Sequence, residues 1–179
     1  MHSLESFHSA RLIAERISEK HFDELLQMHR DGKVMATLGG VRAEEVWTRE
    51  FLMKSIAHWN EHGFGLWVFR DKTNGKFAGR GGLRHINVAG NEEVELAYAL
   101  MSEYWGKGLA TELAIASLKI GFERLVLANI VCFTMTTNYA SQRVMQKAGF
   151  IYERDIIHAN LPHVLYRMTA EAWKKLSRL

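Results

Sequence analysis

The chain has 179 residues, of which 47% are hydrophobic and 24% are charged. This length fits one well-buried domain, and the composition is that of a globular protein rather than of a disordered chain. The net charge of +3 comes from basic residues that are spread along the chain, which argues against nucleic-acid binding.

The sequence carries no signature of membrane insertion or export. Its longest apolar stretch, 125–135, is interrupted by Asn129 and is far shorter than the ~20 residues that span a bilayer. The start of the chain lacks the basic and apolar regions of a signal peptide, and the single cysteine, Cys132, cannot form an internal disulfide. We expect a cytoplasmic protein with a single domain over 1–179.

The first third of the chain predicts a strand followed by helices. Residues 11–17 are expected to form a strand, and Ser18 then precedes a short stretch with helical periodicity. From 43 to 62 the apolar residues mostly recur at spacings of three and four, and Gly63 follows them. This pattern predicts a long amphipathic helix that ends at the glycine.

A meander of strands is expected next. Strands over 65–69 and from Phe77 onward flank the segment 71–76, which contains an Asn-Gly pair. Such a pair adopts positive φ readily and favours a tight hairpin turn. Residues 93–100 begin with the alternation of polar and apolar positions that is typical of a strand with two different faces.

The second half of the chain predicts alternating helices and strands. The expected elements are a helix over 111–124, a strand over 130–135, a helix over 138–147 that Gly149 ends, strands over 151–157 and 164–168, and a short polar helix through Trp173. The whole order indicates an α+β fold whose mixed sheet has its parallel pairing in the middle. It is not the order of a doubly wound dinucleotide-binding fold.

The segment between the strand 93–100 and the following helix carries two glycines, Gly106 and Gly108. A glycine turn that leads from a strand into a helix exposes backbone N–H groups at the positive end of the helix dipole, where a phosphate binds well. Lys107 adds a positive charge there, or is simply a solvated lysine. The spacing matches neither the phosphate loop of nucleotide triphosphatases nor the dinucleotide fingerprint.

These residues resemble the GNAT acetyltransferase superfamily. Its pyrophosphate loop reads Arg/Gln-x-x-Gly-x-Gly/Ala and corresponds to Trp105-Gly106-Lys107-Gly108-Leu109-Ala110, with Trp105 in place of Arg or Gln. A tryptophan there is typical of the branch that contains the ribosomal-protein alanine acetyltransferases. The resemblance covers about 10–173 and extends to Arg11-Leu12-Ile13, Glu95-Leu96-Ala97-Tyr98, Asn138-Tyr139-Ala140-Ser141 and Lys147-Ala148-Gly149-Phe150.

The resemblance implies a three-layer fold, with helices on both faces of a mixed, mostly antiparallel sheet of about seven strands. This sheet splays between its fourth and fifth strands, and the family places the pantetheine of acetyl-CoA in the gap. No metal is implied. The expected cofactor-binding residues are Leu100, Met101, Trp105, Gly106, Lys107, Gly108, Leu109, Ala110, Thr111, Asn138 and Ser141.

The family also implies direct attack of an amine on the thioester, with no acyl-enzyme. Glu95 is the expected base, on the strand beside the thioester, and Glu93 is its nearest substitute. Many members carry a tyrosine as general acid where this chain has Met145, which cannot donate a proton. Ser141 could instead hydrogen-bond the departing sulfur, or only cap a helix, and Asn138 shares that ambiguity.

The sequence leaves the acceptor open. The amine could be a protein N-terminal α-amine, as the tryptophan-containing branch suggests, or a small-molecule amine. A monomer and a homodimer both remain open, and no membrane or nucleic-acid partner is expected. The competing hypothesis is a catalytically silent acyl-CoA-binding or protein-interaction module, which Met145 alone favours.

Overall fold

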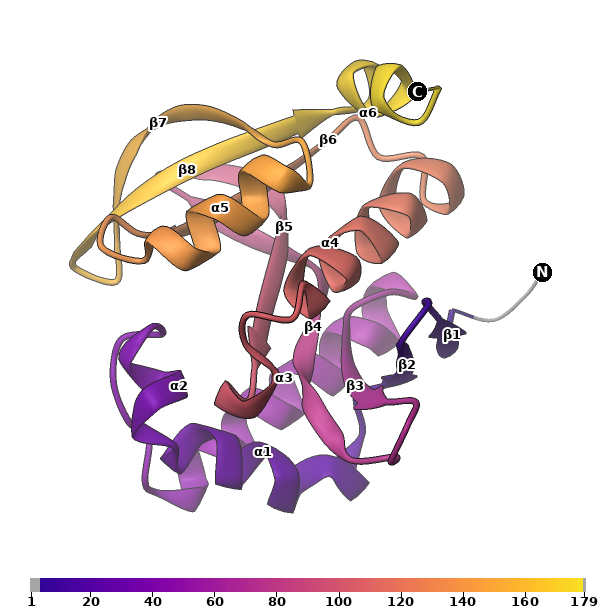
Figure 1. Cartoon of the computed structure of the whole chain (residues 1–179). Helices are drawn as coiled ribbons and strands as arrows, with labels where there is room; N and C mark the ends of the chain where they lie inside the picture. The colour runs from indigo at the N-terminus through magenta and orange to yellow at the C-terminus, as the bar shows by residue number, and fades with distance from the viewer. Residues whose placement is uncertain (1–3, 179) are drawn as a thin grey trace. The chain divides into compact units, whose positions relative to one another are not determined.

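The computed structural model, shown in Figure 1, describes residues 4–178. The chain divides into two compact units. Unit 1 comprises the residues up to Gly82 together with Tyr98–Leu113, and unit 2 comprises Leu83–Ala97 and the residues from Ala114 onward. Strands β4, Phe77–Val88, and β5, Asn91–Leu100, each run from one unit into the other. Among residues 4–178, no helix is both long and apolar enough to span a membrane.

Unit 1 contains an antiparallel sheet in the order β1-β2-β3-β4 and three α-helices before the glycine segment that holds Gly106 and Gly108. Its elements besides parts of β4 and β5 are β1 Ser6–His8, β2 Leu12–Arg16, η1 Glu19–His21, α1 Phe22–Arg30, α2 Gly32–Ala36, α3 Glu45–His62, β3 Leu66–Asp71, η2 Ser102–Tyr104 and the start of α4 Leu109–Lys119. The predicted strand and long helix are confirmed, and Gly63 ends α3 with a φ of 73°.

Two features of unit 1 differ from the sequence-based expectation. The three-residue strand β1 pairs with β2 and was not expected, because so short a segment shows no periodicity. The β3–β4 hairpin forms, but Gly75 has a positive φ of 70° whereas Asn74 is not among the residues with positive φ. The Gly75 N–H donates to the Asp71 carbonyl at 2.8 Å, so the connection is a longer loop than a two-residue turn.

Unit 2 contains the sheet order β4-β5-β6-β8-β7, and its elements after α4 are η3 Ile120–Arg124, β6 Asn129–Met135, α5 Tyr139–Lys147, β7 Ile151–His158, β8 Leu161–Thr169 and α6 Ala170–Leu176. The predicted elements are confirmed. Strands β5 and β6 are parallel and share the single register pair of Glu95 with Val131, whereas β6 pairs with β8 along the whole length of β6. Strands β5 and β6 are the fourth and fifth strands of the sequence-based prediction, which did not include β1. The sparse pairing agrees with the splay expected between them. Residues 4–178 thus contain eight strands rather than about seven.

Apolar side chains hold the end of β5 in unit 1. Met28 of α1 and Val34 of α2 are buried against Ala99, and the partly buried Phe77 and Met101 pack on the same cluster. The first two helices therefore fix the position at which β5 ends and the glycine segment begins.

A buried histidine gives unit 1 an acid-sensitive core. His29 is fully buried, its Nδ1 lies 2.8 Å from the Thr48 hydroxyl, and its Nε2 has no hydrogen-bond partner among residues 4–178. Burial, and secondarily the positive charge of Arg80, lowers the pKa of His29 to about 3. In the unfolded chain the pKa of this histidine is about 6.5. Between about pH 3 and pH 6.5, His29 is therefore protonated in the unfolded chain and neutral in the folded chain.

Stability should fall as the pH drops below 6.5, and His29 alone should contribute a loss of about 2 kcal/mol between pH 7 and pH 5. Urea unfolding at both pH values measures this loss. A His29→Gln variant should lose about 2 kcal/mol less than the wild type over the same interval. Equal pH dependence in His29→Gln and the wild type would contradict the assignment.

Candidate functional site

The glycine segment lies in unit 1 between η2 and α4. Gly106 and Gly108 have φ values of 72° and 75°, which favour glycine, and residues 105–108 are exposed. A Cβ built on Gly106 would meet no atom within 4 Å, and one on Gly108 would meet only the Arg11 guanidinium at 3.6 Å. The space in front of both glycines is therefore open to a ligand.

Helix α4 begins directly after this turn, at Leu109. Its first intrahelical hydrogen bond runs from the Glu112 N–H to the Gly108 carbonyl at 3.1 Å. The N–H groups of Leu109, Ala110 and Thr111 precede that bond, in the turn where a helix leaves its amides without intrahelical acceptors. Together with the open glycine turn, these amides fit a pyrophosphate by geometry and by the sign of the helix dipole.

Trp105 ties the turn back to the end of β5. Its indole N–H donates to the Leu100 carbonyl at 2.8 Å, and 44% of the residue is exposed. The Met101 N–H, in the same peptide unit as that carbonyl, donates to Ala78 of β4 at 2.9 Å. In a strand, the N–H and C=O of one residue point to the same edge, and successive residues point to opposite edges. Because the Met101 N–H points toward β4, the Leu100 N–H faces the edge away from β4.

Lys107 is exposed, and its ammonium lies 5.6 Å from the centre of the buried Tyr104 ring. This contact places the lysine charge along η2, on the same turn as the two glycines. A side chain held this loosely can reorient toward an anion.

The two carboxylates expected as base are both ion-paired in unit 2. Glu95 is 5% exposed, and its Oε2 accepts from Arg84 Nε at 2.8 Å. Glu93 accepts two hydrogen bonds from Arg167, at 3.0 and 2.8 Å, and Arg167 also binds Glu153. Glu93 is thus part of a larger ionic cluster, whereas Glu95 is paired with Arg84.

The start of α5 shows a helix cap in unit 2. The Asn138 side chain accepts from the Ser141 N–H at 3.1 Å, which is the capping arrangement expected of asparagine. Ser141 is partly exposed in the first turn of α5. Met145 is buried, with 1% of its surface exposed, so this position provides no proton donor.

Sequence reasoning missed a set of polar contacts that hold the glycine turn. Glu112, in the first turn of α4, accepts from the Ser9 hydroxyl at 2.6 Å and from Arg11 through its backbone N–H and its Nε, both at 2.7 Å. Arg11 Nη1 also donates to the Lys107 carbonyl at 2.8 Å. The only sequence signal was an acidic residue in the first turn of a helix that is expected to bind an anion.

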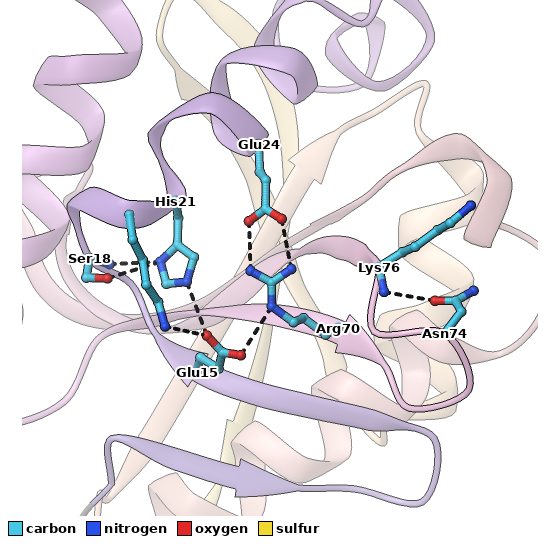
Figure 2. Close-up of polar contacts among 8 residues, drawn as sticks. Glu15, Ser18, His21, Glu24, Arg70, Asn74 and Lys76 are labelled. Carbon is cyan, nitrogen blue, oxygen red and sulfur yellow. Dashed lines mark hydrogen bonds and ion pairs between the residues drawn. The ribbon is translucent and has the colours of Figure 1, made fainter.

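A second polar cluster of unit 1 lies around Glu15 (Figure 2). Glu15 contacts Lys20 at 2.9 Å, His21 at 3.3 Å and Arg70 at 3.1 Å, and Arg70 also forms a bidentate pair with Glu24. The hydrogen bond from Lys20 is the main cause that lowers the pKa of Glu15 to about 2, despite partial burial. Its charge is therefore neutralised by residues of the chain itself.

An open cavity of about 710 Å³ adjoins this cluster, and its lining includes Glu5, Glu15, Arg16 and Lys20. These charges are paired with one another, since Arg16 contacts Glu5 at 3.1 Å and Lys20 contacts Glu15. The cavity shares no lining residue with the glycine segment. The glycine turn therefore remains the candidate site in unit 1.

Comparison with known proteins shows which family the chain belongs to. A family model described as an acetyltransferase (GNAT) domain matches residues 11–151. The chain is 26% identical over 191 residues to an FsC-acetyl coenzyme A-N(2)-transacetylase of Aspergillus fumigatus, covering 97% of this chain and 80% of the relative.

Two solved structures share the fold. An acetyltransferase from Agrobacterium tumefaciens superposes with a TM-score of 0.81 at 21% identity, covering 94% of this chain and 96% of that one. A ribosomal-protein-S5-alanine acetyltransferase from Vibrio fischeri gives 0.73 at 20% identity, covering 94% and 98%. With the family match across most of the sequence, these observations show that the chain belongs to the GNAT acetyltransferase family, a family of acetyl-CoA-dependent acyltransferases.

Proposed function

We propose that this protein transfers the acetyl group of acetyl-CoA to a primary amine by direct attack in a ternary complex. The open glycine turn at the start of α4 carries the proposal, since it presents backbone N–H groups of a kind that suits a pyrophosphate. The name of the Aspergillus relative, an acetyl coenzyme A N(2)-transacetylase, supports an amine as the acceptor.

The donor is held, in this proposal, by the main chain of unit 1. The N–H groups of Gly106, Gly108 and the first turn of α4 bind the pyrophosphate, with Lys107 as an added charge. The Leu100 N–H faces the edge of β5 away from β4 and suits pantetheine, whereas the Met101 N–H already donates to the Ala78 carbonyl. Asn138 and Ser141 remain proposed cofactor contacts from α5.

The chemistry requires two proton movements. The neutral amine nitrogen attacks the thioester carbonyl, the C–N bond forms, and the C–S bond breaks to release the thiolate of CoA. Glu95 accepts the proton that the amine loses, and its bond to Arg84 fixes the position of the carboxylate. Ser141 stabilises the departing sulfur through its hydroxyl, and the thiolate takes its proton from solvent because Met145 cannot supply one.

A catalytically silent acyl-CoA-binding module is the alternative. The buried methionine at position 145 is the observation that favours it, because this position lacks the tyrosine used by many members of the superfamily. Cofactor binding is expected under both hypotheses, so turnover separates them.

Release of the CoA thiol from acetyl-CoA tests the proposal with three acceptor classes: a peptide with a free N-terminal alanine, an N-terminally blocked lysine peptide and a small primary amine. Turnover with the first but not the second class would indicate an N-terminal acetyltransferase. Ser141→Ala should lower kcat about tenfold if the hydroxyl acts on the sulfur, and leave kcat unchanged if Ser141 serves only through its backbone N–H, which donates to the Asn138 side chain in the cap. Tight binding of acetyl-CoA without turnover of any acceptor would support the silent module.

A further inference from the structure

Ser9 and Arg11, which lie between β1 and β2, hold the glycine turn through hydrogen bonds. Glu112 is only 15% exposed at its side chain and receives hydrogen bonds from Ser9 and from both the backbone and the guanidinium of Arg11. Burial raises the pKa of Glu112, but these hydrogen bonds outweigh it, and the pKa lies below its ordinary value. Glu112 is therefore an ionised carboxylate in the first turn of α4.

This carboxylate creates an electrostatic conflict. An acidic side chain in the first helical turn stabilises the free helix, but it also opposes the binding of a second anion to the same end of the helix. Arg11 resolves the conflict, since its Nε lies 2.7 Å from Glu112 Oε2 and cancels the negative charge.

The other arm of Arg11 orients the turn itself. Arg11 Nη1 donates to the Lys107 carbonyl at 2.8 Å, and that carbonyl shares one trans peptide unit with the Gly108 N–H. In a planar trans peptide the C=O and N–H bonds point in opposite directions. Fixing the carbonyl on Arg11 therefore aims the Gly108 N–H away from Arg11, where a ligand can reach it.

We propose that Arg11 is a positioning residue for the donor: it neutralises Glu112 and orients the peptide between Lys107 and Gly108, so that the turn is preset for pyrophosphate before the ligand arrives. This inference rests on the proposed function, because it presupposes that acetyl-CoA binds at the turn. Lysine cannot replace the arginine, because one ammonium cannot reproduce the planar fork that joins the two acceptors.

Calorimetric titration with CoA tests the inference in five proteins: the wild type, Arg11→Gln, Arg11→Lys, Glu112→Gln and the double variant of Arg11→Gln and Glu112→Gln. Arg11→Gln should weaken CoA binding about tenfold, since it removes a charge-assisted bond and leaves Glu112 without its cation. Adding Glu112→Gln to this variant should recover most of the lost affinity. Arg11→Lys, which keeps the positive charge but cannot serve both acceptors, should bind CoA more weakly than the wild type and more tightly than Arg11→Gln.

Two further readouts separate positioning from direct contact and from general damage. Turnover of acetyl-pantetheine, which lacks the pyrophosphate, should be the same in Arg11→Gln and the wild type. The KM for acetyl-CoA should rise about tenfold in Arg11→Gln while kcat stays within twofold. Loss of acetyl-pantetheine turnover would show that the variant is merely damaged, and would overturn the inference.

The double variant decides between the remaining outcomes. If Arg11 bound the phosphates directly and did not neutralise Glu112, Glu112→Gln would change the affinity by the same factor with and without Arg11, and the positioning role would be wrong. Unchanged affinity in Arg11→Gln would overturn it as well. Failure of the wild type to bind CoA would instead contradict the proposed function, so the two failures are distinguishable in the same titrations.

Discussion

Gly108→Trp should abolish measurable binding of acetyl-CoA, with an increase in Kd of at least about 100-fold. The tryptophan side chain would fill the open space in front of the turn, where a Cβ has only the Arg11 guanidinium near it. It would also force a φ of 75° on a residue that adopts it at a cost of roughly 1–2 kcal/mol. Loss of two or more charge-assisted hydrogen bonds, at about 1.5–3 kcal/mol each, accounts for the expected effect.

A matched variant separates the lost site from the backbone strain. Gly63, at the end of α3, has nearly the same φ of 73° and no atom within 4 Å of a built Cβ. Gly63→Trp should therefore lower the melting temperature by about as much as Gly108→Trp does, and leave the affinity for acetyl-CoA unchanged. Wild-type affinity in Gly108→Trp would show that the donor does not bind at this turn.

Glu95→Gln should lower kcat about 100-fold at pH 7 and leave the Kd for acetyl-CoA within twofold of the wild type. The glutamine keeps the shape and one oxygen for Arg84, but it cannot accept a proton. The deficit should shrink as the pH rises toward the pKa of the acceptor amine, because the neutral amine then forms without help. Steady-state rates from pH 6.5 to pH 9.5 measure both effects.

Glu93→Gln is the control for this prediction, since Glu93 lies on the same strand and is the alternative base. Because Arg167 also binds Glu153, the ionic cluster should survive the change. Its kcat should stay within about threefold of the wild type. A large loss in Glu93→Gln together with normal rates in Glu95→Gln would exchange the two roles.

The sequence pattern predicted those elements whose signal is local. Helix α3 shows an apolar periodicity and a glycine at its end, and β6 is rich in β-branched and aromatic residues, so both were found. Strand β1 was missed because three residues carry no period and its pairing with β2 is a tertiary contact. The hairpin at Gly75 was found, but the details of its turn were not, because Asn74 did not adopt positive φ.

The glycine turn was found from spacing, while its support could not be. Arg11 and Glu112 are 101 positions apart in sequence, and nothing in either segment indicates that they meet. The same holds for the ion pairs that distinguish Glu95 from Glu93, since their partners Arg84 and Arg167 are set by strand pairing. Local chemistry predicts which groups are candidates, whereas tertiary contacts decide how each one is held.

The melting temperature with and without acetyl-CoA tests the central claim most directly, because a ligand that binds only the folded chain must stabilise it by mass action. At a concentration 100 times its Kd, acetyl-CoA should add about 2.7 kcal/mol and raise the midpoint by roughly 5–10 °C. Pantetheine alone, which lacks the pyrophosphate, should give a much smaller shift. No shift at millimolar acetyl-CoA would contradict a donor site at the glycine turn.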